Sequence, residues 1–185
     1  MIMPTSGWHI RQTTAGDLPA VLRLYDEAVV WLNAQGITEQ WGVTPVSSRL
    51  HLVEEITGFL QYGMVMVAEG IGIQGFIAVN FTVPDEFALH TERASLSDGG
   101  YVETLVARRT PAARGVGADL LHWAEQHTLS RGKTCLRLSC WAGNPELISY
   151  YERRGFTRCG EVADENRNSQ LFEKHLPRVK ILGAL

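Results

Sequence analysis

One short segment constrains the fold of this chain more than any other. The stretch from Glu103 to Ala118 reads E-T-L-V-A-R-R-T-P-A-A-R-G-V-G-A. Its first half has strand character and ends near Arg108, Thr110-Pro111 is a turn signal, and Gly115 and Gly117 stand where a helical pattern begins. The segment therefore predicts a strand that enters a helix through a glycine-rich turn.

Such a turn is suited to binding an anion. Glycines allow the backbone to approach a ligand closely, and the first N–H groups of a helix can bind a pyrophosphate, to which Arg114 would add a positive charge. The alternative is that Gly115 and Gly117 only allow the helix to pack closely on the sheet, and the segment alone leaves both interpretations open. A P-loop requires Lys and then Ser or Thr after its last glycine, and here Ala118 and Asp119 follow Gly117. A dinucleotide-binding fingerprint requires Gly or Ala three residues after Gly117, where Leu120 stands. Both motifs are therefore excluded.

The hydrophobic pattern predicts the remaining elements. Strands are expected over residues 8–13, 64–69, 73–81, 101–108, 135–140, 157–162 and 170–175. Helices are expected from Asp17 to about Gly36, from Ser47 or Ser48 to about Leu60, and over residues 114–130 and 146–154, with a surface loop over 90–100. The first helix should bury one apolar stripe: Leu18, Val21, Leu22, Tyr25, Ala28, Val29 and Leu32. This order predicts an α/β fold of the α+β type, whose mixed sheet contains an antiparallel meander and one parallel crossover.

Composition limits the class of protein. The chain has 185 residues, 45% of them hydrophobic and 20% charged, which predicts a single globular domain over residues 1–185. Its net charge of −3 argues against a nucleic-acid coat or a basic membrane binder, and no apolar run approaches the roughly 18 residues of a membrane span. The start of the chain does not resemble a secretory signal, so we expect a cytoplasmic location. The three cysteines lack metal-ligand spacing, so we expect reduced thiols and no metal site.

A second informative segment runs from Trp141 to Phe156. Asn144-Pro145 predicts a helix start, and Gly155 predicts the helix end. Tyr150 and Tyr151 are adjacent, so they point in different directions from the helix. Taken alone, either tyrosine is explained by packing with its hydroxyl at the edge of the core.

The two segments together resemble the GNAT superfamily of acyl-CoA-dependent N-acyltransferases. That family carries [QR]-x-x-G-x-[GA] after its fourth strand, and the stretch 112–117 fits it except at Ala112, which replaces the Gln or Arg. The family's later N-x-x-x-x-x-x-Y-x-x-x-G-F stretch is matched by Asn144, Tyr151 and Gly155-Phe156. The resemblance implies a mostly antiparallel central sheet, flanked by helices, with a parallel splay between its fourth and fifth strands.

The resemblance also implies where acyl-CoA binds. The pantetheine arm would lie between the strands at 101–108 and 134–140, held by the backbone of residues 105–107, with the pyrophosphate on the N–H groups of 113–118. The implied cofactor-binding residues are Leu105, Val106, Ala107, Ala112, Ala113, Arg114, Gly115, Val116, Gly117, Ala118 and Asn144. Tyr151 matches the family's general acid, which protonates the departing CoA thiolate.

A base for the attacking amine is predicted from the strand that the resemblance assigns to the thioester. Glu103 lies two residues before Leu105, on the same face of the strand. The alternative, a strand glutamate in a cross-strand ion pair, stays open, and His90 and His122 are lesser candidates. Trp31 and Trp41 could line an acceptor pocket or pack in the core, and packing is favoured.

These observations predict an N-acetyltransferase that moves an acetyl group from acetyl-CoA directly to a primary amine of a small molecule or a protein. Such a reaction requires no metal and no covalent intermediate. The alternatives are an enzyme that uses a longer acyl-CoA, a non-catalytic acyl-CoA-binding module, and an interaction domain. The expected partners are acyl-CoA and an amine, without nucleic acid or membrane, and a homodimer stays open.

Overall fold

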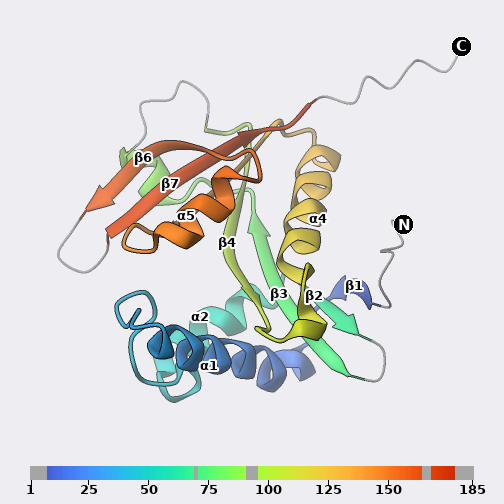
Figure 1. Ribbon diagram of the computed structural model, residues 1–185. Coiled ribbons are helices and arrows are strands. Elements are labelled where there is room, and N and C mark those ends of the chain that lie inside the picture. The colour runs from blue at the N-terminus through green and yellow to red at the C-terminus, as the bar shows by residue number, and fades with distance from the viewer. Residues whose placement is uncertain (1–7, 69–70, 91–95, 164–167, 178–185) are drawn as a thin grey trace, which may run out of the picture. The chain divides into compact units, whose positions relative to one another are not determined.

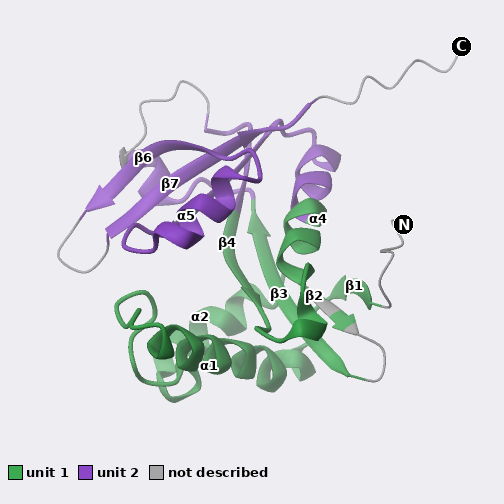
Figure 2. Cartoon of the chain, viewed as in Figure 1, with its two compact units in different colours: residues 1–80, 102–123 green, residues 81–101, 124–185 purple. Residues whose placement is uncertain are grey.

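The structure is a computed structural model that describes residues 8–68, 71–90, 96–163 and 168–177 (Figure 1). The chain divides into two compact units (Figure 2). The first unit contains residues 1–80 and 102–123, and the second contains residues 81–101 and 124–185. Strand β4 (Gly99–Ala107) and helix α4 (Val116–Ser130) each contribute to both units.

The first unit combines strands with two helices and three short 3₁₀ turns. Its chain order is β1 (Trp8–Gln12), η1 (Ala15–Asp17), α1 (Leu18–Ala34), η2 (Val46–Ser48), α2 (Leu50–Phe59), β2 (Gly63–Ala68), β3 (Gly72–Asn80), most of β4, η3 (Pro111–Ala113) and the start of α4. Strand β2 pairs antiparallel with both β1 and β3, and β3 neighbours β4. The predicted meander is therefore present.

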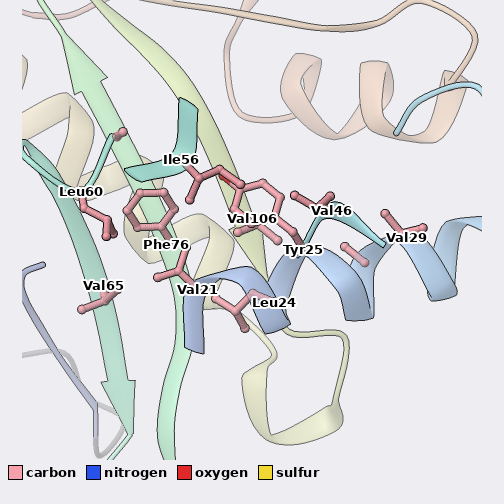
Figure 3. Close-up of a cluster of buried hydrophobic side chains, with 12 residues drawn as sticks. Val21, Leu24, Tyr25, Val29, Val46, Ile56, Leu60, Val65, Phe76 and Val106 are labelled. Atoms are coloured by element: carbon pink, nitrogen blue, oxygen red, sulfur yellow. The ribbon is translucent and has the colours of Figure 1, made fainter. Parts of the chain in front are cut away.

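The core of the first unit is apolar. Phe76 of β3 and Val65 of β2 are fully buried beneath the stripe of α1 (Figure 3). The cluster consists of Val21, Leu24, Tyr25, Ala28, Val29, Val46, Ile56, Leu60, Val65, Phe76, Ala78 and Val106. The predicted stripe is confirmed, with Leu18 and Leu22 partly buried at its edge. Leu24 was not predicted, although it lies three residues after Val21 and four before Ala28, and it widens the buried stripe on one side.

The second unit is built around a second antiparallel group of strands. It contains α3 (Asp85–His90), the start of β4, the end of α4, β5 (Cys135–Trp141), α5 (Pro145–Glu152), β6 (Thr157–Ala163) and β7 (Asn168–His175). Strand β7 pairs antiparallel with β5 on one side and with β6 on the other. A small apolar cluster joins Phe87, Tyr101, Val162 and Leu171.

The complete strand order is β1-β2-β3-β4-β5-β7-β6, with β4 and β5 parallel. This confirms the predicted mixed sheet with one parallel pair. None of the helices among the described residues is long and apolar enough to cross a membrane.

Several predicted boundaries differ from the structure. No element was predicted for residues 82–89, so α3 was missed, because it has too few residues to show helical periodicity; it buries Phe87. Strand β4 begins at Gly99, within the predicted loop over 90–100. Residues 91–95 of that loop, Glu69 of the predicted strand over 64–69, and Gly70 after it lie outside the described residues. Ser47 and Ser48 belong to a 3₁₀ turn, and α2 begins at Leu50. Helix α4 begins after Gly115 rather than at Arg114, because the φ of Gly115 is +97° and a left-handed residue cannot belong to the helix.

Candidate functional site

The glycine turn connects β4 to α4 in the first unit. After β4 the chain makes the 3₁₀ turn Pro111–Ala113, Arg114 is extended, and Gly115 adopts φ +97° immediately before α4. A Cβ atom at Gly115 would meet nothing within 4 Å. Glycine is therefore favoured at this position by the backbone conformation and not by crowding.

A glycine in the neighbouring strand sets the start of α4. A Cβ atom on Gly75 of β3 would come within 2.5 Å of Val116 Cγ1 and 2.8 Å of Leu120 Cδ1. Val116 and Leu120 are both fully buried. Gly75 therefore lets the first turn of α4 pack directly on β3. Sequence reasoning missed Gly75, because an isolated glycine in a strand does not reveal which helix it faces.

Several amides of the turn are used within the turn itself. The N–H groups of Ala113 and Arg114 donate to the carbonyls of Thr110 and Pro111, at 3.0 and 3.2 Å. Those of Ala118 and Asp119 both donate to the carbonyl of Gly115, at 2.9 and 3.0 Å.

The amides of residues 115–117 precede these bonded groups. By helix geometry, the first N–H groups of α4 have no acceptor within the helix. Residues 115–117 are therefore the donors of this turn that are best suited to an anion.

The side chains around the turn are mostly exposed or packed on α1. Arg114 and Ala112 are exposed. Arg108 forms an ion pair with Glu27 of α1, with 3.0 Å between Nε and Oε2. The guanidinium of Arg109 lies 4.6 Å from the ring centroid of Trp31. One face of the Trp31 ring is therefore covered by an arginine.

Trp41 belongs to the core region rather than to an open wall. Its ring lies 5.2 Å from that of Tyr25 and packs against the apolar cluster of the first unit. The packing alternative that the sequence favoured for Trp41 is the one that the contacts support.

Glu103 is half-buried near the middle of β4. Its neighbour Thr104 hydrogen-bonds the hydroxyl of Tyr25 on α1, so alternation along the strand directs Glu103 to the opposite face. Burial, followed by the negative charges of Glu103 and Glu55, raises the pKa of Tyr62 to about 12. This part of the first unit is therefore negatively charged. His122 is exposed on α4, and His90 is the last residue of α3.

Tyr151 lies in the second unit, on α5, and is 7% exposed. Its ring packs against Phe156 and Phe172, each with a centroid distance of 5.8 Å. Tyr150 is half-buried, with the guanidinium of Arg154 3.7 Å from its ring centroid. The adjacent tyrosines therefore differ as predicted, and Tyr151 is the one that packs inward.

Asn144 has a local structural role. Its side-chain oxygen accepts a hydrogen bond from the N–H of Leu147 at 3.0 Å, which caps the N-terminus of α5. Pro145 follows at the first helical position, and Gly155, with φ +83°, lies beyond the helix end. The predicted helix start is confirmed. Capping of α5 is by itself a sufficient reason for an asparagine at position 144, with no ligand required.

The predicted site residues fall in both units. Glu103 and the turn residues 105–118 belong to the first unit, whereas Asn144 and Tyr151 belong to the second. Within the first unit, β4, the turn and the first turn of α4 are continuous, and Gly75 of β3 supports them.

Comparisons with known proteins identify the family and the fold. The family model described as "Acetyltransferase (GNAT) family" matches residues 54–156, more than half of the chain. A Bacillus subtilis (strain 168) protein, "Uncharacterized N-acetyltransferase YesJ", is 28% identical over 165 residues, covering 86% of each chain.

Two solved structures share the fold. A GNAT-family acetyltransferase from Listeria monocytogenes 4b F2365 aligns with a TM-score of 0.69 and 20% identity, over 94% of this chain and 99% of that one. The PaiA N-acetyltransferase of Thermoplasma acidophilum, solved with coenzyme A, aligns with a TM-score of 0.65 and 18% identity, over 91% and 98%.

Proposed function

Because the chain belongs to the GNAT acetyltransferase family, and is thus an acyltransferase, we propose that it transfers an acetyl group from acetyl-CoA directly to a primary amine. The acceptor is an amine of a small molecule, a lysine side chain or a protein N-terminus. The observation that carries this proposal is the glycine turn between β4 and α4, whose amides at residues 115–117 suit a pyrophosphate.

The proposal assigns the cofactor to the segment that contains the turn. The backbone of Leu105, Val106 and Ala107 would hold the amides of the pantetheine arm and polarise the thioester carbonyl. Arg114 would add charge near the pyrophosphate, whereas Ala112 offers no polar contact. The coenzyme A complex of the PaiA relative supports this choice of cofactor. Preorganised N–H donors are most effective against the oxyanion that forms as an amine attacks a thioester.

Two proton transfers complete the proposed reaction. A lysine-like amine with a pKa near 10.4 is uncharged in roughly one molecule of 2,500 at pH 7, so a base must remove its proton. Glu103, in a negatively charged part of β4, takes this role, directly or through water. Tyr151 gives its proton to the CoA thiolate as the carbon–sulfur bond breaks. Because these roles are distributed over both units, the proposal also requires residues 1–185 to act as one domain.

The test combines an acceptor screen with a matched pair of tyrosine variants. Acetyl-CoA is incubated with a panel of small amines and peptides, and acetylated products are identified by mass spectrometry. Removing a positioned general acid lowers the rate by about 10²–10⁴-fold. Tyr151→Phe should therefore lose turnover and keep its affinity for acetyl-CoA, whereas Tyr150→Phe should stay within a few-fold of wild type.

The possible failures of this test point to different conclusions. Acetyl-CoA binding without acetylation of any amine would favour a non-catalytic acyl-CoA-binding module. Turnover with a longer acyl-CoA alone would change the donor and keep the mechanism. Wild-type turnover of Tyr151→Phe, when chemistry limits the rate, would remove Tyr151 as the acid.

A further inference from the structure

Three potential metal ligands meet on the β5–β7 pair of the second unit, and none of them is among the proposed catalytic or cofactor-binding residues. In the antiparallel register, Cys135 lies opposite His175 and Arg137 lies opposite Glu173. Residues two apart on a strand face the same side of the sheet. All four side chains therefore share one face.

The ligand atoms of Cys135, Glu173 and His175 are already close together. Glu173 Oε1 lies 3.4 Å from His175 Nε2, and Glu173 Oε2 lies 3.9 Å from Cys135 Sγ. One ligand atom from each residue lies within 4.8 Å of the other two. Ligands bound tetrahedrally at about 2.0–2.3 Å from zinc are separated by roughly 3.3–3.8 Å. Small side-chain rotations would bring these atoms to that spacing.

The charges around the three residues favour a cation. The Arg137 guanidinium lies 3.0 Å from Asp98 Oδ1 and 3.5 Å from Glu173 Oε2, so two carboxylates share one positive charge. With a neutral thiol at Cys135 this group has a formal charge of −1, and with a thiolate it has −2. A divalent cation would balance the thiolate form.

The site is open to solvent on one side. The side chain of His175 is 67% exposed, whereas that of Glu173 is 2% exposed, and Cys135 is fully buried. An ion can therefore enter past the histidine and reach ligands that water does not cover. Arg137, on the other carboxylate oxygen, would hold Glu173 in position as an outer partner.

We propose that Cys135, Glu173 and His175 bind a zinc ion through Sγ, Oε1 and Nε2, with water as the fourth ligand. Thiolate and imidazole ligands favour zinc over magnesium or calcium. On binding, the Cys135 thiol releases its proton to solvent, and His175 coordinates as the neutral imidazole. Because the ion joins β5 to β7, its role is to stabilise the second unit. This inference does not depend on the proposed acetyl transfer.

The test uses the full chain, reduced and freed of metal with a chelator. Titration with Co²⁺ should give one bound ion per chain, with tetrahedral d–d bands and a thiolate-to-cobalt charge-transfer band. Zn²⁺ should displace the cobalt and raise the midpoint of thermal unfolding, because binding to the folded state stabilises it. Cys135→Ser should abolish the charge-transfer band. Loss of an outer-sphere partner typically weakens metal binding by about 10–100-fold. His175→Ala removes a direct ligand, so it should weaken Zn²⁺ binding by at least about tenfold.

Matched variants separate this site from adventitious binding. Cys159→Ser changes another cysteine that forms no disulfide, and His122→Ala changes another exposed histidine. Both variants should bind Zn²⁺ as wild type does. Because Cys135 is buried, the folding of Cys135→Ser is checked by circular dichroism. If this variant does not fold, the Zn²⁺ affinity of His175→Ala tests the proposal. The proposal is overturned if reduced wild type shows no charge-transfer band, if the band survives in folded Cys135→Ser, or if His175→Ala binds Zn²⁺ as tightly as wild type.

Discussion

Both compact units bury apolar clusters, but they differ in the charged side chains that they bury. The described cluster of the first unit is entirely apolar, and its buried carboxylate, Asp17, pairs with Arg11 only six residues away. The second unit buries both Arg137 and Glu173, each 1% exposed, and their positions are 36 residues apart in the chain. Stability should therefore depend on side-chain volume in the first unit and on charge pairing in the second.

The paired charges of the second unit are held by several polar groups. Arg137 Nη1 donates to Asp98 Oδ1 at 3.0 Å and to the carbonyl of Leu96 at 3.2 Å. The Tyr101 hydroxyl donates to the same carbonyl at 2.6 Å. This network connects the segment before β4 to β5. A buried charge is tolerated only when it is paired, so removing one member should cost more than the pair itself contributes.

Arg137→Met should have the largest effect on stability. It leaves Glu173 as a buried carboxylate without its guanidinium, which typically costs about 3–5 kcal/mol of unfolding free energy. Denaturant unfolding measures the loss, and hydrogen exchange should locate it in β5 and β7. The double variant Arg137→Met/Glu173→Met should recover most of it, because an apolar pair of similar volume leaves no unpaired charge. If the double variant were as unstable as the single one, volume and not charge would govern this unit.

Leu24→Ala probes the other unit. Leu24 is 1% exposed within the apolar cluster, and truncating a buried leucine typically costs about 2–5 kcal/mol through lost transfer energy and the remaining cavity. No charge is involved, so the loss should not change with salt concentration between low and high ionic strength. A strongly salt-dependent loss, measured by denaturant unfolding, would contradict the proposed difference between the units.

Asp17 should give a smaller, pH-dependent effect in the first unit. The hydrogen bonds from Arg11, followed by those from Thr14, lower the pKa of Asp17 to about 2 from its ordinary value of 3.8, against an opposing effect of burial. A folded-state pKa below the unfolded one contributes stability that is complete above about pH 4 and is lost as the pH falls toward about 2.

Asp17→Asn should therefore lower the unfolding free energy by about 1–2 kcal/mol at pH 7. This is less than the full pKa shift of Asp17 would give, because the Arg11 side chain is 38% exposed and solvent screens its charge. Unfolding measured from pH 7 to pH 2 should show the difference from wild type shrinking through that window. If the difference in unfolding free energy between wild type and Asp17→Asn stayed constant down to pH 2, the charge of Asp17 would not be its cause. The loss would then come from hydrogen bonds that the uncharged carboxyl of Asp17 also makes.

The smallest effect is expected for Arg114→Ala, measured as a loss of affinity for acetyl-CoA. If the first unit binds the anion through its backbone, an exposed arginine should contribute roughly 0.2–1 kcal/mol, decreasing with salt. Gly117→Val is the matched comparison, because it crowds the first turn of α4 and should weaken binding far more. Calorimetry that found the opposite ranking in two folded variants would make side-chain charge the main anchor.

Much of the candidate site follows from local sequence. The turn after β4 and the ends of α5 depend on residues within a few positions of each other, whereas the inward packing of Tyr151 also needs Phe172, 21 residues later. Gly75 and α3 were missed for different reasons. Gly75 acquires its role only from Val116 and Leu120, more than forty residues later, and α3 is too short for its periodicity to be detected.

The sequence by itself determined those features that arise from local backbone preferences. Gly115 favours the left-handed turn before α4, Asn144 caps α5, and Asp17 accepts the N–H of Thr14 three residues before it. Only the tertiary structure decided that Cys135 lies opposite His175 and Arg137 opposite Glu173. The physical reason is that strand register is set by the packing of whole faces, so no spacing along the chain reveals it.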